Sequence, residues 1–124
     1  MRTIRLLICG GYGALLTVLL LAPNPAAVVG LRRVPVFPWG DIGIHFTAFT
    51  ILTLLVYVAQ WPKGIGWAAS AVLVAYGITT ESLQWFVPSR AVELLDYTEN
   101  ILGVAAGTGI YWLGRAWKKG RSPE

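Results

Sequence analysis

The strongest constraint on this chain is the gathering of its apolar residues into four long runs. They cover residues 4–22, 44–61, 65–87 and 94–114. Pro23, Pro62 and Pro88 follow the first three runs and end each helix, because proline has no amide hydrogen. A helix of about 20 residues rises about 30 Å, the thickness of a bilayer's hydrocarbon core. The runs therefore predict an all-α, polytopic membrane protein, with residues 1–124 forming one domain built as a bundle of four transmembrane helices.

The composition excludes several other classes of protein. Hydrophobic residues make up 56% of the chain and charged residues only 13%, whereas water-soluble domains carry about 25% charged residues. The same balance excludes disorder, and the single cysteine, Cys9, excludes an internal disulfide framework. The net charge of +4 is compatible with nucleic-acid binding. The basic residues lie at the ends of the apolar runs rather than on one face, however, so we expect no nucleic-acid partner.

The basic residues also predict how the chain is oriented in the membrane. In a four-span arrangement, one side receives Arg2, Arg5, Lys63, Arg115, Lys118, Lys119 and Arg121, and the other receives Arg32, Arg33 and Arg90. Cytoplasmic flanks collect Lys and Arg, so both termini are predicted to be cytoplasmic. The alternative is that the first run is a cleaved signal peptide. That run is longer than the usual apolar core of about 7 to 15 residues, which favours a retained helix.

A small set of polar residues interrupts the apolar runs near their ends. The set consists of Asp41, His45, Glu81, Gln84, Arg90, Asp96 and Asn100. Within each helix its members are three or four positions apart, so they share a face. In the four-span topology the second and fourth helices begin, and the third ends, on the extracytoplasmic side. The pattern therefore predicts one outward-facing polar site, in which Arg90 pairs with Glu81 or Asp96.

Several of these residues also admit a purely structural explanation. Asp41 can cap the second helix and hold His45 by a hydrogen bond. Asp96 can act as a first-turn acid of the fourth helix, and Asn100 can join neighbouring helices. Glu81 lies deepest in its span, so its carboxylate must find a cationic partner or a proton.

Other residues near the set are expected to have structural or solvent-facing roles. Gly103 and Gly107 form a small-residue face that lets two helices approach closely, and we expect them to act in packing. Glu93 and Glu99 are interpreted as acids that face solvent or lipid headgroups.

The residues of this polar set allow several kinds of chemistry and do not identify one function. His45 and Glu81 are candidates for acid–base catalysis, and Arg90 could hold a phosphate or carboxylate through two parallel hydrogen bonds. The histidine and the acids could also present ligands to a divalent ion. The chain has no GxSxG, HExxH, paired CxxC or glycine-rich phosphate motif. We therefore expect neither a metal nor another cofactor.

The ordered series of polar residues resembles the VanZ-like family of bacterial membrane proteins. The resemblance covers residues 39–107 and is carried by Asp41, His45, Phe46, Glu81, Gln84, Arg90, Asp96, Asn100 and Gly103. It implies an integral protein of the bacterial cytoplasmic membrane, in a family named for a member that lowers susceptibility to the glycopeptide teicoplanin. Family members often carry a lysine directly after the first acid. This chain has Ile42 there and so lacks the positive charge beside Asp41.

Two classes of function stay open for the site. In the first, the protein binds a membrane lipid, a cell-wall precursor or an amphiphilic antibiotic, and contributes to teicoplanin-type resistance. In the second, it is a small enzyme that acts on an anionic lipid headgroup or a polyprenyl carrier. The first is favoured because no catalytic constellation is complete. A transporter is a third class, for which four helices would have to assemble as a homo-oligomer to enclose a path.

Overall fold

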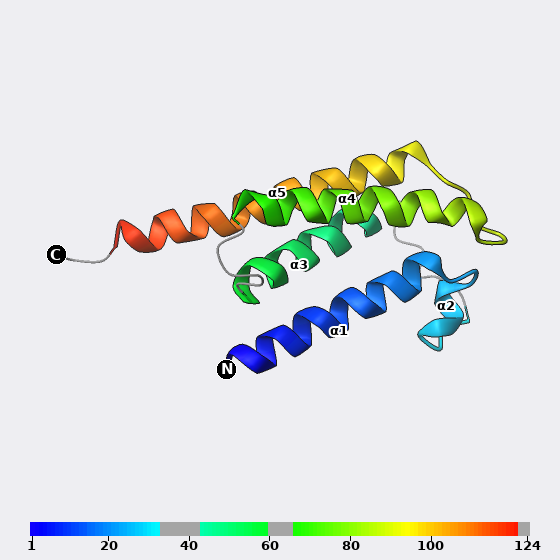
Figure 1. Ribbon diagram of the computed structural model, residues 1–124, viewed down its shortest axis with the longest axis horizontal. Coiled ribbons are helices and arrows are strands. Elements are labelled where there is room, and N and C mark those ends of the chain that lie inside the picture. Colours follow the sequence, from blue (N-terminus) through cyan, green and yellow to red (C-terminus); the bar gives the residue numbers. More distant parts are fainter. Residues whose placement is uncertain (33–42, 60–65, 122–124) are drawn as a thin grey trace.

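In the computed structural model, residues 1–32, 43–59 and 66–121 are described, and within these ranges the chain is helical with no strand. The helices are α1 (Arg2–Leu21), α2 (Pro25–Val28), α3 (Ile44–Ala59), α4 (Trp67–Leu83) and α5 (Leu94–Lys119), with a 3₁₀ turn η1 (Gln84–Phe86) after α4 (Figure 1). The predicted all-α class is confirmed.

The boundaries of α1 and α2 follow from the residues around the first break. Ala22 adopts an extended conformation with ψ of 137° and thereby ends α1, as expected where prolines follow closely. Asn24 then caps α2, because its side-chain oxygen accepts a hydrogen bond from the backbone nitrogen of Ala27 at 3.3 Å. Pro25 occupies the first position of α2, where a missing amide hydrogen has little cost.

Two predicted spans differ from the helices at their ends. The fourth run was expected to end at residue 114, yet α5 continues to Lys119. Gly114 is tolerated within this helix, and Lys118 and Lys119 lie in its last turn, where cations interact favourably with the helix dipole. The third run was expected to stay helical to residue 87. Instead α4 tightens into η1, and Val87 is extended ahead of Pro88.

The helices form a bundle in which α3 lies between α1 and α5. Helix α3 makes its most extensive contacts with α5, α4 also packs on α5, and α1 packs mainly on α3. Figure 1 shows the start of α1 and the end of α5 at one end of the bundle. Helix α2, the beginnings of α3 and α5, and the end of α4 lie at the opposite end. The described members of the polar set from the sequence analysis lie at this end.

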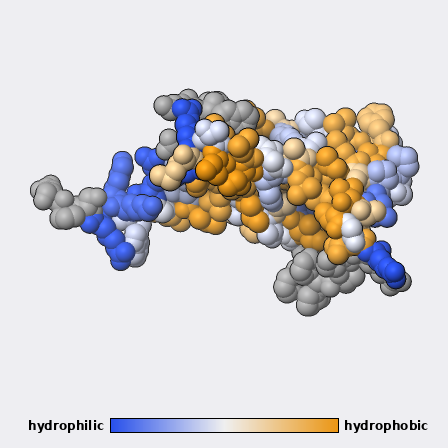
Figure 2. Space-filling model, turned by 90° about the horizontal axis from the view of Figure 1, so that it is seen from below, coloured by the Kyte–Doolittle hydropathy of each residue, from blue (hydrophilic) through white to orange (hydrophobic). Residues whose placement is uncertain are grey.

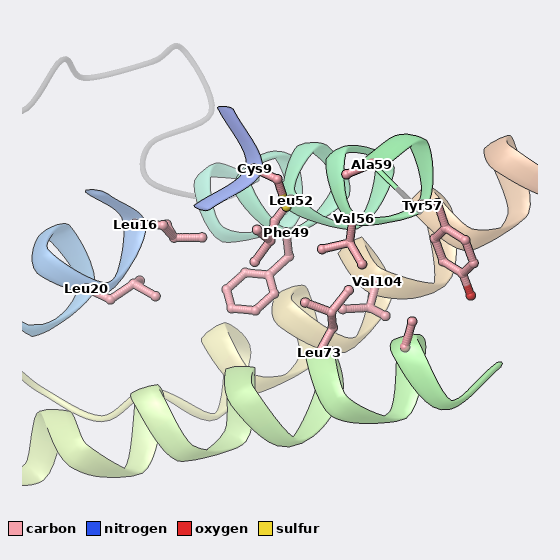
Figure 3. Close-up of a cluster of buried hydrophobic side chains, with 11 residues drawn as sticks. Cys9, Leu16, Leu20, Phe49, Leu52, Val56, Tyr57, Ala59, Leu73 and Val104 are labelled. Atoms are coloured by element: carbon pink, nitrogen blue, oxygen red, sulfur yellow. The ribbon is translucent and has the colours of Figure 1, made fainter. Parts of the chain in front are cut away.

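The hydrophobic core runs along the inner faces of the helices. Phe49 of α3 is completely buried at its centre, and Figure 3 shows this ring among side chains from α1, α3, α4 and α5. Leu16 and Leu20 come from α1, and Leu73 and Val104 come from α4 and α5. Phe49 and Tyr76 pack with ring centroids 5.8 Å apart, within the range of favourable aromatic pairs.

The contact between α3 and α5 depends on two glycines. A Cβ at Gly103 would lie 2.6 Å from the carbonyl oxygen of Phe46, and one at Gly107 would lie 2.8 Å from that of Thr50. Both atoms belong to the α3 backbone and cannot rotate away. The structure therefore places Gly103 and Gly107 where only glycine permits this backbone approach.

Large apolar side chains cover much of the outer surface. Leu7, Leu15 and Val18 of α1, Val72 of α4 and Leu113 of α5 are all exposed. Figure 2 shows the apolar surface gathered over the middle of the molecule, with hydrophilic residues mainly towards the two ends.

Length and hydropathy single out one helix as a membrane span. Among the described helices, α1 alone combines at least 18 residues with sufficient apolarity, with a mean hydropathy of 2.0. Helix α3 is apolar but has 16 residues, a rise of about 24 Å.

Candidate functional site

The polar end of the bundle brings together residues from three helices and one loop. His45 lies in the first turn of α3, Glu81 in the last turn of α4, and Asp96 in the first turn of α5. Gln84 belongs to η1, and Asn100 follows Asp96 by one turn on α5. Asp41, the remaining acid predicted for this site, lies outside the described residues.

Asn100 fixes the orientation of the His45 ring. The Asn100 side-chain nitrogen Nδ2 donates to the carbonyl oxygen of Gly77 at 3.2 Å, which leaves Oδ1 as the acceptor. Oδ1 lies 3.0 Å from Nδ1 of His45. In the neutral ring Nδ1 therefore carries the hydrogen, and Nε2 presents a lone pair.

The other ring nitrogen of His45 faces acids. Nε2 lies 3.6 Å from Oδ2 of Asp96, which is too long for a hydrogen bond. A carboxylate oxygen of Glu81 completes the group, and the three ligand atoms lie within 4.8 Å of one another. We call His45, Glu81 and Asp96 the His45 cluster.

Two side chains at this end are buried without full hydrogen bonding. Glu81 is 0% exposed, and its Oε1 accepts only a long hydrogen bond of 3.4 Å from the backbone nitrogen of Glu93. Its Oε2 has no partner among the described residues, and neither has Nε2 of Gln84, which is 2% exposed. Buried polar atoms without partners are uncommon in folded proteins, and each one calls for a specific explanation, such as a functional role or a bound water or ion.

Arg90 does not make the predicted ion pair with Glu81 or Asp96 among the described residues. Its Nη2 instead donates to the carbonyl oxygen of Leu20 at 3.0 Å. That carbonyl belongs to the last turn of α1, where backbone oxygens lack partners within the helix. Arg90 therefore ties the end of α1 to the loop between η1 and α5, while its Nε has no hydrogen-bond partner within the described ranges.

The interpretation of Glu99 as a solvent-facing or headgroup-facing acid was wrong. Glu99 is 6% exposed, and its carboxylate accepts hydrogen bonds from the backbone nitrogens of Gly43 at 2.7 Å and Phe46 at 3.4 Å. It thus caps the N-terminus of α3 from α5. Nothing in the local sequence distinguishes it from Glu93, which is exposed.

A cavity of about 570 Å³ opens beside the cluster. One wall is apolar and comes mainly from α1 and α2, with Leu15, Leu16, Leu19 and Ala26 among its residues. The other end is polar and is formed by His45, Gln84, Arg90, Glu93 and Asp96. Sequence reasoning missed the apolar wall, because leucines facing a cavity and leucines facing lipid have the same composition.

The fold and the cavity define a helical bundle with an apolar exterior and a polar site between helix ends. Within this class, the chain matches the VanZ/LLP1 family over residues 12–115 and belongs to that family. The resemblance inferred from the sequence is therefore confirmed, and the match extends beyond residues 39–107. No curated protein and no solved structure matches the chain.

Proposed function

We propose that the protein binds an amphiphilic molecule of the bacterial envelope in the cavity between α1 and the polar helix ends. The observation that carries this proposal is the two-sided lining of the cavity, which is apolar along α1 and α2 and polar at His45, Gln84 and Arg90. The apolar wall suits an acyl or prenyl chain. Nε2 of Gln84, which has no partner among the residues that the structure describes, and the guanidinium of Arg90 are donors suited to an anionic headgroup.

The proposed setting is the cytoplasmic membrane, crossed four times with both termini in the cytoplasm. Of the eight described basic residues, Arg2, Arg5, Arg115, Lys118, Lys119 and Arg121 lie towards the end that carries the termini, and Arg32 and Arg90 lie towards the other. This distribution supports the orientation, because cytoplasmic flanks are enriched in Lys and Arg. The site then opens at the extracytoplasmic side.

Cysteine labelling in whole cells tests the orientation. In a Cys9→Ala background, Arg32→Cys should react with a membrane-impermeant maleimide, and Lys118→Cys should react only after the membrane is opened. The reverse pattern would exclude the proposed topology.

A matched pair of substitutions on α1 tests the cavity. Leu15→Trp places bulk in the cavity wall, whereas Val18→Trp adds the same bulk at a side chain that is 52% exposed and does not line the cavity. We expect the first variant to weaken binding of a short prenyl phosphate by about tenfold or more, a loss of about 1.4 kcal/mol, and the second to bind as the parent does. Equal binding by both variants would refute the cavity as the site.

A contribution to teicoplanin-type resistance follows from the same proposal. Cells that produce the protein should gain tolerance to the acylated antibiotic, and gain little towards its deacylated core, which lacks the chain that the apolar wall would hold. Leu15→Trp should abolish this difference while Val18→Trp retains it. Equal tolerance to both compounds would show that resistance does not depend on binding in the cavity.

A catalytic role in headgroup chemistry is the second candidate. It is favoured by the lone pair on Nε2 of His45, a residue that lines the cavity together with Asp96, because this lone pair could accept a proton. Incubation of the purified protein with a prenyl phosphate distinguishes the two functions. Release of phosphate that is lost in His45→Gln would favour the enzyme, whereas recovery of the unchanged compound supports binding alone.

A further inference from the structure

The His45 cluster places three groups with lone pairs around one small volume. In the neutral ring, Nε2 of His45 carries no hydrogen, since Nδ1 donates to Asn100. Nε2 lies 3.6 Å from Oδ2 of Asp96, and one ligand atom each from His45, Glu81 and Asp96 lie within 4.8 Å of one another. Lone pairs that converge in this way repel one another unless a cation or a proton lies between them.

The distances suit a cation better than a direct contact. Two ligands bonded to one tetrahedral ion at about 2.0–2.1 Å are separated by about 3.3–3.4 Å. The separation of 3.6 Å between His45 Nε2 and Asp96 Oδ2 is close to this value, although it is too long for a hydrogen bond. Small movements of the three side chains would bring all their ligand atoms to bonding distance.

The surroundings of the cluster point independently to a bound group. Glu81 is fully buried, and its Oε2 has no hydrogen-bond partner among the described residues. Asn100, itself 1% exposed, holds the ring of His45 through the nitrogen that does not face the acids. Histidines that bind metals are held in the same way, with the second ring nitrogen donating to an oxygen.

We propose that His45, Glu81 and Asp96 bind one divalent transition-metal ion, with Zn²⁺ as the preferred ion. One imidazole and two carboxylates form a mixed nitrogen and oxygen set, which favours Zn²⁺ over the purely oxygen-seeking Mg²⁺ and Ca²⁺. His45 and Asp96 line the cavity, which gives the ion a path of entry. This inference does not depend on the amphiphile proposal, because its test contains no amphiphile.

Metal binding can be measured on the full chain in a non-ionic detergent. The protein should be prepared without a polyhistidine tag and treated with EDTA to remove bound metal. It is then titrated separately with ZnCl₂, MgCl₂ and CaCl₂ in a calorimeter. We expect one Zn²⁺ per chain and weaker binding of the other two ions. Absence of Zn²⁺ binding, or a preference for Mg²⁺ or Ca²⁺, would overturn the proposal.

His45 is the only histidine in the chain, so nitrogen NMR reports on this ring alone. We expect Zn²⁺ to shift the Nε2 resonance while Nδ1 keeps its hydrogen. A doubly protonated ring in the presence of saturating Zn²⁺ would mean that a proton occupies the place of the ion, and would overturn the proposal. This measurement uses the parent protein and does not depend on the folding of any variant.

Substitutions then locate the ion within the cavity. Asp96→Asn and Glu81→Gln should lower Zn²⁺ affinity by more than the roughly 10- to 100-fold that loss of a supporting residue costs. Glu93→Gln is the matched control, because Glu93 is an exposed acid that lines the same cavity outside the cluster. It should lower Zn²⁺ affinity far less than either cluster variant, because it removes a neighbouring acid but no ligand. Loss of affinity in Glu93→Gln alone would place the ion elsewhere and refute the cluster as its site.

Discussion

Two groups of polar residues join the same three helices at opposite ends of the bundle, and they differ in how well they are satisfied. Towards the end with the termini, Tyr57 of α3, Ser70 of α4 and Thr108 of α5 form a hydroxyl cluster. Ser70 Oγ lies 2.8 Å from the Tyr57 hydroxyl and 2.7 Å from Oγ1 of Thr108. The Tyr57 hydroxyl also lies 3.0 Å from the carbonyl oxygen of Gly66, and that of Thr108 lies 2.8 Å from the carbonyl oxygen of Val104. Each hydroxyl thus has a partner, although the three hydrogens can occupy only three of the four contacts at a time.

The side chains of the His45 cluster do not form a comparable set of hydrogen bonds with one another. Nε2 of His45 and Oδ2 of Asp96 are 3.6 Å apart, too far for a hydrogen bond, and one buried oxygen of Glu81 has no partner in the described part of the chain. A buried polar group that finds partners stabilises a fold modestly, whereas an unpaired one costs about 1–3 kcal/mol. The comparison indicates that the hydroxyl cluster holds helices together, and it supports the binding role that we propose for the His45 cluster.

The largest expected effect comes from the contact on which both clusters depend. Gly103→Val would drive a side chain into the α3 backbone near Phe46, and we expect a loss of about 3 kcal/mol or more of folding free energy. Gly109→Ala is the control, because nothing lies within 4 Å of its added Cβ. Thermal unfolding in detergent measures both variants. If the Gly103→Val protein is as stable as the parent, the close contact between α3 and α5 is not needed for stability.

A smaller loss is expected at the hydroxyl cluster. Ser70→Ala removes the link between Tyr57 and Thr108 and should lower the folding free energy by about 1–2 kcal/mol. Ser82→Ala offers a comparison, since its hydroxyl lies 2.9 Å from that of Tyr97 in an exposed pair. It should change stability by less than about 0.5 kcal/mol. If chemical denaturation gives the same loss of stability for Ser70→Ala and Ser82→Ala, the buried hydroxyl cluster contributes no more to stability than the exposed pair.

Arg90→Lys separates charge from geometry at the polar end. Lysine keeps the charge and can reach the carbonyl of Leu20, so we expect stability to fall by less than about 1 kcal/mol. Binding of a prenyl phosphate should fall more strongly, because lysine lacks the planar fork that holds an anion through two hydrogen bonds. If binding by this variant equals that of the parent in calorimetry, charge alone suffices. If the protein no longer accumulates, Arg90 acts chiefly through Leu20.

The smallest effect on stability is expected at Glu81. Glu81→Gln keeps the shape of the side chain and replaces a buried carboxyl group that has no close hydrogen bond among the described residues. We expect the melting temperature in EDTA to stay the same or rise, because burial of an uncompensated charge opposes folding. A clear fall in melting temperature without metal would mean that Glu81 supports the fold, and the contrast between the two clusters would then disappear.

Much of this architecture could be predicted from local patterns. The apolar runs predicted each long helix, and the prolines located the breaks, because both effects act within a few residues. Spacings of three and four also predicted which polar residues share a helical face. The ordered series from His45 to Gly103 was enough to indicate the family, which the match over residues 12–115 confirms.

The partners of individual side chains were decided by tertiary structure. Glu99 and Glu93 have the same chemistry and lie six positions apart, yet Glu99 caps α3 while Glu93 is exposed at the cavity. Arg90 contacts Leu20, which is 70 positions away in sequence, rather than the nearby acids. Only the packing of α1 on α3 places an apolar wall beside His45. Composition and periodicity determine which residues leave water. The distances between helices determine which polar atoms then meet, and no local pattern encodes those distances.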